Sequence, residues 1–223
     1  MSIIVPGRFD LVNKKFDNLT IDNIEKSIGE YNYVNNDSKD LKSYHILDLS
    51  GNVIFNISLH SISTNFSHIT ELYLINNELK EIPQEINTLI NLKKLYVSKN
   101  KLESISNINK LEKLEILDLR ANRITQIKNI ENNLKLNYIS LSNNLIESID
   151  GFPILLNLET LFLFSNQIKD FNSFCKDLKT KSPNVSKLLV ENNPMLVNVK
   201  STYIQTIKES LPKIATIDFQ KIN

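Results

Sequence analysis

One short motif recurs along this chain at nearly constant spacing, and it limits the fold more than any other feature of the sequence. The motif has leucine or a similar apolar residue at positions one, four, six and eleven, and asparagine at position nine. Its clearest copies place their asparagines 22 residues apart, at Asn100, Asn122, Asn144 and Asn166. Three further copies, one of them weaker, have Asn52, Asn77 and Asn193. Seven copies in phase over residues 44–195 indicate a repeat protein.

Each copy is too short to bury its apolar residues alone, so we expect one short strand and a return segment per copy, stacked into a solenoid. The apolar positions then point into a shared core. The asparagine amide carries donors and an acceptor, so it can satisfy turn backbone groups of its own and the adjacent repeat. Asparagine occurs 31 times in the chain. We interpret the copies outside this column as compositional bias on loops.

The return segments carry their own pattern. Apolar residues at steps of three, as in 105–111, are typical of short 3₁₀-like turns. In 171–178 the spacing is i, i+3, i+4, i+7, which predicts an amphipathic helix and explains the longer gap of 27 residues before Asn193. The sequence therefore predicts the α/β class, as a solenoid with a curved parallel sheet of about seven strands, 3₁₀ or short helical returns and helical caps.

Both ends of a solenoid need caps, because the core is otherwise exposed. We predict an N-terminal segment and capping helix in 1–43, repeats in 44–196 and a C-terminal cap in 197–223. The N-terminal helix is indicated by Ile21, Ile24, Ile28 and Tyr31. A capping box at Thr202 and Gln205 would begin the C-terminal helix, which places Tyr203, Ile207 and Leu211 on one face. Residues 1–18 show no clear period.

The repeat spacing resembles the intracellular leucine-rich repeat family with 22-residue repeats, whose type member regulates protein phosphatase 1. Residues 201–218 resemble the C-terminal cap of many such proteins, and 201–204 resemble that of mRNA export receptors. The segments 149–153 (IDGFP) and 217–222 (IDFQKI) are similar to the spliceosomal A-prime protein. The resemblance implies a leucine-rich repeat solenoid, with roles that differ between RNA-processing particles, phosphatase regulation and ciliary or axonemal assembly.

The strands of such a solenoid line its concave side, and their third, fifth, seventh and eighth positions point away from the core. Core packing does not require large residues there, yet six are large, and an arginine lies among them. We predict these seven as partner-binding residues: Tyr73, Ile75, Tyr96, Arg120, Tyr138, Phe162 and Phe164. Exposed aromatic residues near arginine are typical of interface hot spots. The alternative is that neighbouring rings stack and stabilise the sheet without a partner.

Composition and scattered polar residues exclude several kinds of site. A net charge of +1 argues against non-specific nucleic-acid binding, and one cysteine excludes an internal disulfide or a cysteine metal cluster. The three histidines are scattered, so we expect no catalytic site, no cofactor and no metal. We interpret a group of basic residues near the middle repeats as a solvated face whose charge is balanced by nearby glutamates. The basic residues are Lys93, Lys94, Lys99, Lys101, Arg120 and Arg123, and the glutamates are Glu103, Glu112 and Glu115.

The sequence thus predicts a non-catalytic scaffold that binds one or more proteins on its concave face. The alternatives are a subunit of an RNA-processing particle, a phosphatase regulatory subunit, or a ciliary or axonemal assembly factor. We expect nucleic acid less than protein as the partner, no membrane association, and a monomer. No apolar run is long enough to span a bilayer and no secretory signal is visible, so we expect an intracellular protein, cytoplasmic or nuclear.

Overall fold

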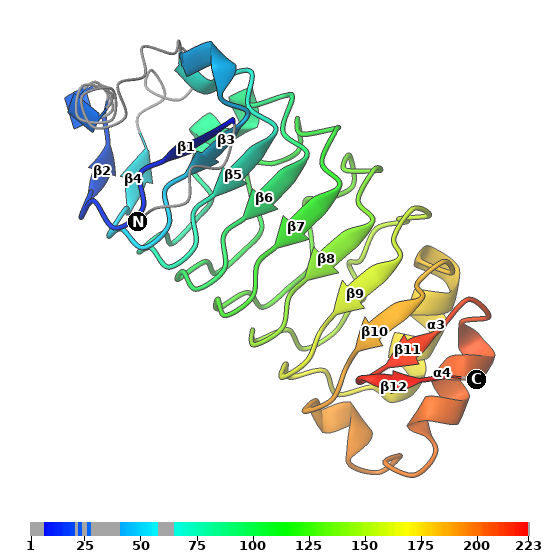
Figure 1. Ribbon diagram of the computed structural model, residues 1–223. Coiled ribbons are helices and arrows are strands. Elements are labelled where there is room, and N and C mark those ends of the chain that lie inside the picture. Colours follow the sequence, from blue (N-terminus) through cyan, green and yellow to red (C-terminus); the bar gives the residue numbers. More distant parts are fainter. Residues whose placement is uncertain (1–6, 21, 24–25, 28–40, 58–64, 223) are drawn as a thin grey trace.

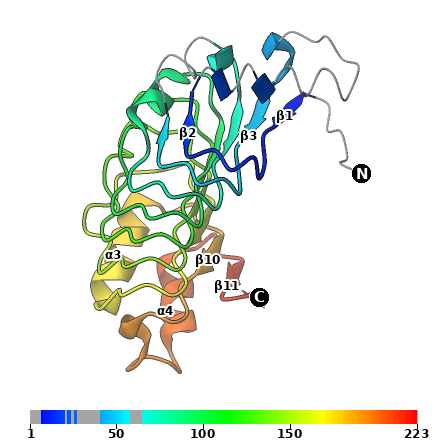
Figure 2. The same cartoon turned by 90° about the vertical axis from the view of Figure 1, so that its left-hand side faces the viewer.

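The framework of the fold is a ten-stranded sheet in the order β1-β3-β5-β6-β7-β8-β9-β10-β11-β12 (Figure 1). The computed structural model describes residues 7–20, 22–23, 26–27, 41–57 and 65–222. Neighbouring strands are parallel, except for the antiparallel pair β11–β12. The strands lie along one side of the curved molecule and the return segments along the other (Figure 2). The predicted α/β solenoid is confirmed.

Seven of these strands come from the seven repeats, one each. They are β3 (Ile46–Asp48), β5 (Glu71–Tyr73), β6 (Lys94–Tyr96), β7 (Ile116–Asp118), β8 (Tyr138–Ser140), β9 (Thr160–Phe162) and β10 (Lys187–Leu189). Their register pairs equivalent repeat positions, so that Leu95 lies between Leu72 and Leu117. Each apolar column of the sequence thereby becomes a continuous row of the core, and Leu117, Leu119 and their equivalents are fully buried.

The regularly spaced asparagines have the predicted role of satisfying turn backbone groups, and Asn144 is representative of them. Its Nδ2 donates to the carbonyl oxygens of Leu141 in its own repeat (2.9 Å) and Leu119 in the preceding one (3.0 Å). Its Oδ1 accepts from the backbone nitrogen of Ile124 at 3.0 Å. The same bonds recur at the other six repeat asparagines. The column therefore joins each coil to the next.

Several asparagines outside this column also bond between repeats, so the interpretation of these residues as compositional bias is wrong. Each donates from its side chain to a backbone carbonyl of the preceding coil: Asn91, Asn107, Asn129, Asn133, Asn157 and Asn184. The physical reason is that irregular return segments leave carbonyls that no helix or sheet satisfies, and a short side-chain amide can reach them.

The residue before each repeat asparagine adopts a left-handed backbone conformation. The φ angle is 68° at Gly51, 56° at Lys99, 54° at Ala121 and 52° at Ser165. Only glycine adopts this conformation without cost, and asparagine tolerates it best among the others. The turn that leads the chain out of each strand is therefore strained where lysine, alanine or serine occupies it.

The return segments follow the predicted pattern. A 3₁₀ helix, η2 (Gln84–Thr88), forms one of them, and in 105–111 the nitrogen of Leu111 bonds the oxygen of Ile108, an i to i+3 turn. The longer return contains the predicted helix, α3 (Phe171–Lys181), whose four apolar residues are buried. Asp170 begins α3, because its side chain accepts from the nitrogen of Ser173 at 2.9 Å.

Additional elements extend the sheet at the N-terminal end. Strand β1 (Arg8–Asp10) pairs with β3 and buries Phe9 and Leu11, while Phe16 donates its backbone N–H to Asn52 Oδ1. These residues thus behave as an additional copy of the motif, which the sequence analysis missed. Strands β2 (Asn18–Leu19) and β4 (Asn56–Ile57) form a separate pair, and η1 (Leu41–Ser43) precedes β3. The predicted N-terminal helix, with Ile21, Ile24, Ile28 and Tyr31, lies outside the described residues.

The C-terminal end consists of η3 (Pro194–Leu196), α4 (Tyr203–Ser210), β11 (Thr216–Ile217) and β12 (Gln220–Lys221). Tyr203, Ile207 and Leu211 are buried as expected. The capping box is not formed, because the hydroxyl of Thr202 donates to the carbonyl of Val199 instead of accepting from the helix. The division into 1–43, 44–196 and 197–223 stays a proposal.

Candidate functional site

The candidate site is the concave face, which we define as the side chains at positions three, five and seven of the strands. All seven predicted partner-binding residues lie on it. Six are partly exposed and Arg120 is exposed: Tyr73, Ile75, Tyr96, Tyr138, Phe162, Phe164 and Arg120. The face divides into an N-terminal part, a central ion pair and a C-terminal part, which differ in chemistry.

In the N-terminal part, aromatic rings stack on one another. The rings of Tyr73 and Tyr96 lie 4.4 Å apart and nearly parallel, at 11°. The guanidinium of Arg8 lies 5.3 Å from the centre of the Tyr73 ring and forms an ion pair with the buried carboxylate of Asp48. These rings therefore follow the alternative interpretation, in which a ladder stabilises the sheet by itself.

Charges in this part also pair with one another. Glu71 accepts from the Tyr73 hydroxyl at 3.0 Å and pairs with the Lys94 ammonium at 2.9 Å. Burial and then the bond to Glu71 raise the pKa of Tyr73, so that its hydroxyl stays protonated. The same carboxylate raises the pKa of Lys94. Arg8, Asp48 and this network were missed from the sequence, although the Phe9-x-Leu11 spacing was a signal for the strand that carries Arg8.

The central ion pair joins two residues of the same repeat. Arg120 donates from Nε and Nη2 to the carboxylate of Asp118, at 2.9 and 2.7 Å. The backbone nitrogen of Arg120 also donates to Asp118, at 3.1 Å. The Asp118 side chain is 2% exposed and the Arg120 side chain 51% exposed. A buried carboxylate thus holds a half-exposed guanidinium, and this bond raises the pKa of Arg120.

The C-terminal part is apolar. Tyr138 and Phe162 meet edge to face, with ring centres 5.5 Å apart at 78°. Phe164 and Leu189 lie beside them, also partly exposed. Burial raises the pKa of Tyr138. We define Tyr138, Phe162, Phe164 and Leu189 as the aromatic patch.

Three of the six residues of the predicted basic group form ion pairs, with acidic residues other than those expected. Lys94 pairs with Glu71, Lys101 with Glu78, and Arg120 with Asp118. The expected glutamates are close to the basic residues in sequence, whereas Glu71 and Glu78 lie on the preceding coil. Lys93, Lys99 and Arg123 are exposed, and within the described ranges none of the three forms an ion pair.

Cys175 and His68 belong to residue types that many enzymes use in catalysis, but each makes the contacts of a structural residue. Cys175 is buried on α3, and burial raises the pKa of its thiol to about 11, so it is protonated at neutral pH. His68 forms a hydrogen bond from Nε2 to the carbonyl of Tyr44 at 2.7 Å. The part of the chain that the structure describes contains no cluster of His, Cys, Asp or Glu suited to a metal ion. Nor does any helix in it have the length and apolar character needed to cross a membrane.

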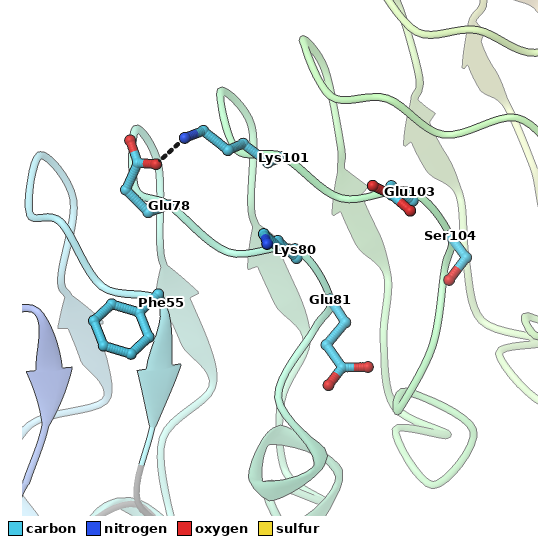
Figure 3. Close-up of a pocket in the computed structure, with 7 residues that line it drawn as sticks. All are labelled: Phe55, Glu78, Lys80, Glu81, Lys101, Glu103 and Ser104. Carbon is cyan, nitrogen blue, oxygen red and sulfur yellow. Dashed lines mark ion pairs between the residues drawn. The ribbon is translucent and has the colours of Figure 1, made fainter.

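A shallow hollow of about 730 Å³ lies away from the concave face, at the turns that follow β5 and β6 (Figure 3). It is lined by Phe55, Glu78, Lys80, Glu81, Lys101, Glu103 and Ser104. Glu78 and Lys101 form an ion pair across it, and Phe55 is 59% exposed. Charges of both signs and a wide opening give this hollow no clear ligand chemistry, so the concave face is the stronger candidate site.

Comparisons with known proteins agree with this architecture. Residues 90–133 match the family model described as leucine-rich repeats in two copies. Over 86 residues, 38% of the chain, the sequence is 41% identical to the CCR4-Not complex 3'-5'-exoribonuclease subunit Ccr4 of Saccharomyces cerevisiae. The match spans only 10% of that curated relative.

Solved structures are similar along most of the chain. Internalin C2 of Listeria monocytogenes has a TM-score of 0.63 and 24% identity, covering 86% of this chain and 76% of that one. A leucine-rich repeat protein of Leptospira interrogans has a TM-score of 0.65 and 23% identity, covering 95% of this chain and 54% of that one. At these identities the likeness shows the fold alone.

Proposed function

We propose that this chain, which is a leucine-rich repeat protein, is a scaffold that holds a partner protein against the concave face of its sheet. The leucine-rich repeat fold supports a protein-interaction scaffold in general, whereas the face and its residues are our proposal. The observation that carries it is the aromatic patch. Partly exposed phenyl rings on a rigid sheet are the kind of surface from which interface hot spots are built.

The three parts of the concave face contribute unequally in this proposal. Tyr73 and Tyr96 already stack on each other, so truncating either would disturb the sheet as well as a partner. Phe162 meets Tyr138 edge to face, but the buried row at this repeat is supplied by Leu161 and Leu163, so replacing Phe162 and Phe164 leaves the core in place. We therefore expect most of the binding free energy at the aromatic patch, about 2–4 kcal/mol for a hot-spot ring.

The test replaces both rings, as Phe162→Ala with Phe164→Ala, and compares capture of binding proteins from the native cell with the wild-type chain. We expect the main partner to be lost while circular dichroism stays unchanged. A matched control is Leu134→Ala with Leu156→Ala, since these leucines are 57% and 56% exposed in equivalent turns that precede β8 and β9. A partner that is retained by the phenylalanine variant and lost by the leucine variant would refute the concave-face proposal.

A second candidate, a subunit of an RNA-processing particle, is favoured by the likeness to Ccr4, whose name places it in the CCR4-Not complex. Its nuclease activity is not transferred, because the match covers a tenth of that protein. Lys93→Glu with Lys94→Glu separates the two candidates. It should matter little for a protein held by apolar contacts and much more for RNA. A non-catalytic, monomeric and intracellular protein stays our prediction.

A further inference from the structure

The central ion pair leaves one edge of a guanidinium free beside the aromatic patch. Arg120 uses Nε and Nη2 to bind Asp118, so Nη1 has no hydrogen-bond partner among the residues that the structure describes. Because Asp118 is buried, the guanidinium is held in place before any ligand arrives. A fixed arginine with a free edge is well suited to bind an anion, since little side-chain entropy is lost on binding.

The sheet register fixes the backbone separation between the strand that leads to this arginine and the strand that carries the two phenylalanines of the aromatic patch. Asp118 on β7 pairs with Ser140 on β8, which pairs with Phe162 on β9. Two strand spacings separate β7 from β9, or about 10 Å. At the two equivalent positions β8 carries Ser140 and Ser142, which are small and buried, and its one large outward side chain, Tyr138, meets Phe162 edge to face and belongs to the aromatic patch.

We infer that the partner presents an acidic peptide segment, in which one carboxylate pairs with Arg120 while an apolar side chain about 10 Å away contacts Phe162 and Phe164. This inference rests on the proposed concave-face function and specifies the chemistry of its partner. On a helix this separation corresponds to about seven residues, and in an extended segment to about three.

The local charge favours a single carboxylate over a phosphate chain. Asp118 already neutralises much of the charge of Arg120, so a dianion would also face that carboxylate. Lys99, three residues after β6, and Arg123, three residues after Arg120, are exposed and form no ion pair in the described part of the chain, so they add a positive charge that favours an acidic segment. RNA needs a track of several free cations, whereas Lys94 and Lys101 are already paired.

The test selects binders from a random peptide library displayed on phage, using the full chain as bait. We expect enrichment of peptides with Asp or Glu at a fixed spacing from an aromatic or aliphatic residue. Arg120→Gln should weaken a selected peptide by roughly 10-fold or more. The matched control Arg123→Gln removes the same charge a few residues away and should change affinity by less than about 3-fold. Replacing the peptide's acid with its amide should abolish the difference between the two variants.

Arg120→Gln leaves the buried carboxylate of Asp118 without its cation, so a variant that protects the fold is needed. Asp118→Asn with Arg120→Gln removes both charges and should weaken binding to the same degree, with an unchanged circular dichroism spectrum.

Three results would overturn the inference. In the first, the selected peptides contain no acidic residue, or Arg120→Gln and Arg123→Gln weaken binding equally, while Phe162→Ala with Phe164→Ala still abolishes binding. This result would refute the acidic partner and leave the concave-face proposal standing. The second is a library without binders, or binding unaffected by the phenylalanine variant, which contradicts both proposals. In the third, single-stranded RNA of random sequence displaces the peptides at physiological salt, and Arg120→Gln and Arg123→Gln weaken the binding of this RNA equally.

Discussion

Replacing one repeat asparagine should cost more free energy of unfolding than any surface substitution in this protein. Asn144 is 4% exposed, donates to the carbonyls of Leu119 and Leu141, and accepts from the nitrogen of Ile124. Alanine leaves the N–H of Ile124 without its acceptor where water cannot reach it, whereas the carbonyls of Leu119 and Leu141 each lose one of two bonds and keep those from Asn122 and Asn166. An unsatisfied buried N–H costs about 1–3 kcal/mol and each lost bond to a carbonyl about 0.5–1.5 kcal/mol, so we expect about 2–5 kcal/mol in all.

The measurement is urea unfolding followed by circular dichroism, for wild type, Asn144→Ala and a control. The control is Asn132→Ala, since Asn132 is exposed and makes one side-chain bond, to the carbonyl of Asn109 at 3.2 Å. We expect it to change the free energy of unfolding by less than about 0.5 kcal/mol. A loss below about 1 kcal/mol for Asn144→Ala would refute the reasoning that the column satisfies buried backbone groups.

Asn144→Asp adds a pH dependence whose sign follows from the same contacts. The carboxylate would still accept from Ile124, but its second oxygen would face two carbonyl oxygens. Its pKa is therefore raised in the folded state above the unfolded value of about 3.9. The variant should approach wild-type stability below about pH 4 and lose it as pH rises through the folded pKa. A stability difference that is independent of pH would contradict this.

Three other predictions use the same assays. Leu119→Ala should lower the free energy of unfolding by about 2–5 kcal/mol, because Leu119 is fully buried in the stacked core; a change below about 1 kcal/mol would argue against it. Ala121→Gly should raise stability by up to about 1 kcal/mol, since Ala121 has φ 54°; a lower melting temperature would show that the turn is unstrained. Deleting 201–223 should cause aggregation or loss of cooperative unfolding, because α4 and β11 cover the last coil; unchanged melting of a monomer would mean that the segment is a tail.

The sequence alone was sufficient for the core of the seven repeats, their seven strands and the asparagine column. Each of these depends on a property that repeats with the motif. Alternation along a strand decides which residues are buried, and a constant period decides that equivalent residues become neighbours. For this reason the burial of Leu117 and the bonds of Asn144 followed from spacing, without knowledge of the curvature.

The chemistry of the concave face was decided only by the tertiary structure. Arg8 lies 40 residues from Asp48 in sequence, and one parallel strand pair brings them together. Whether Tyr73 meets a partner or Tyr96, and whether Arg120 is free or held by Asp118, depends on rotamers and on side chains of adjacent coils. The repeat period does not determine which side chains the outward residues contact. An exposed side chain can adopt several rotamers, whereas close packing in the core excludes most of them.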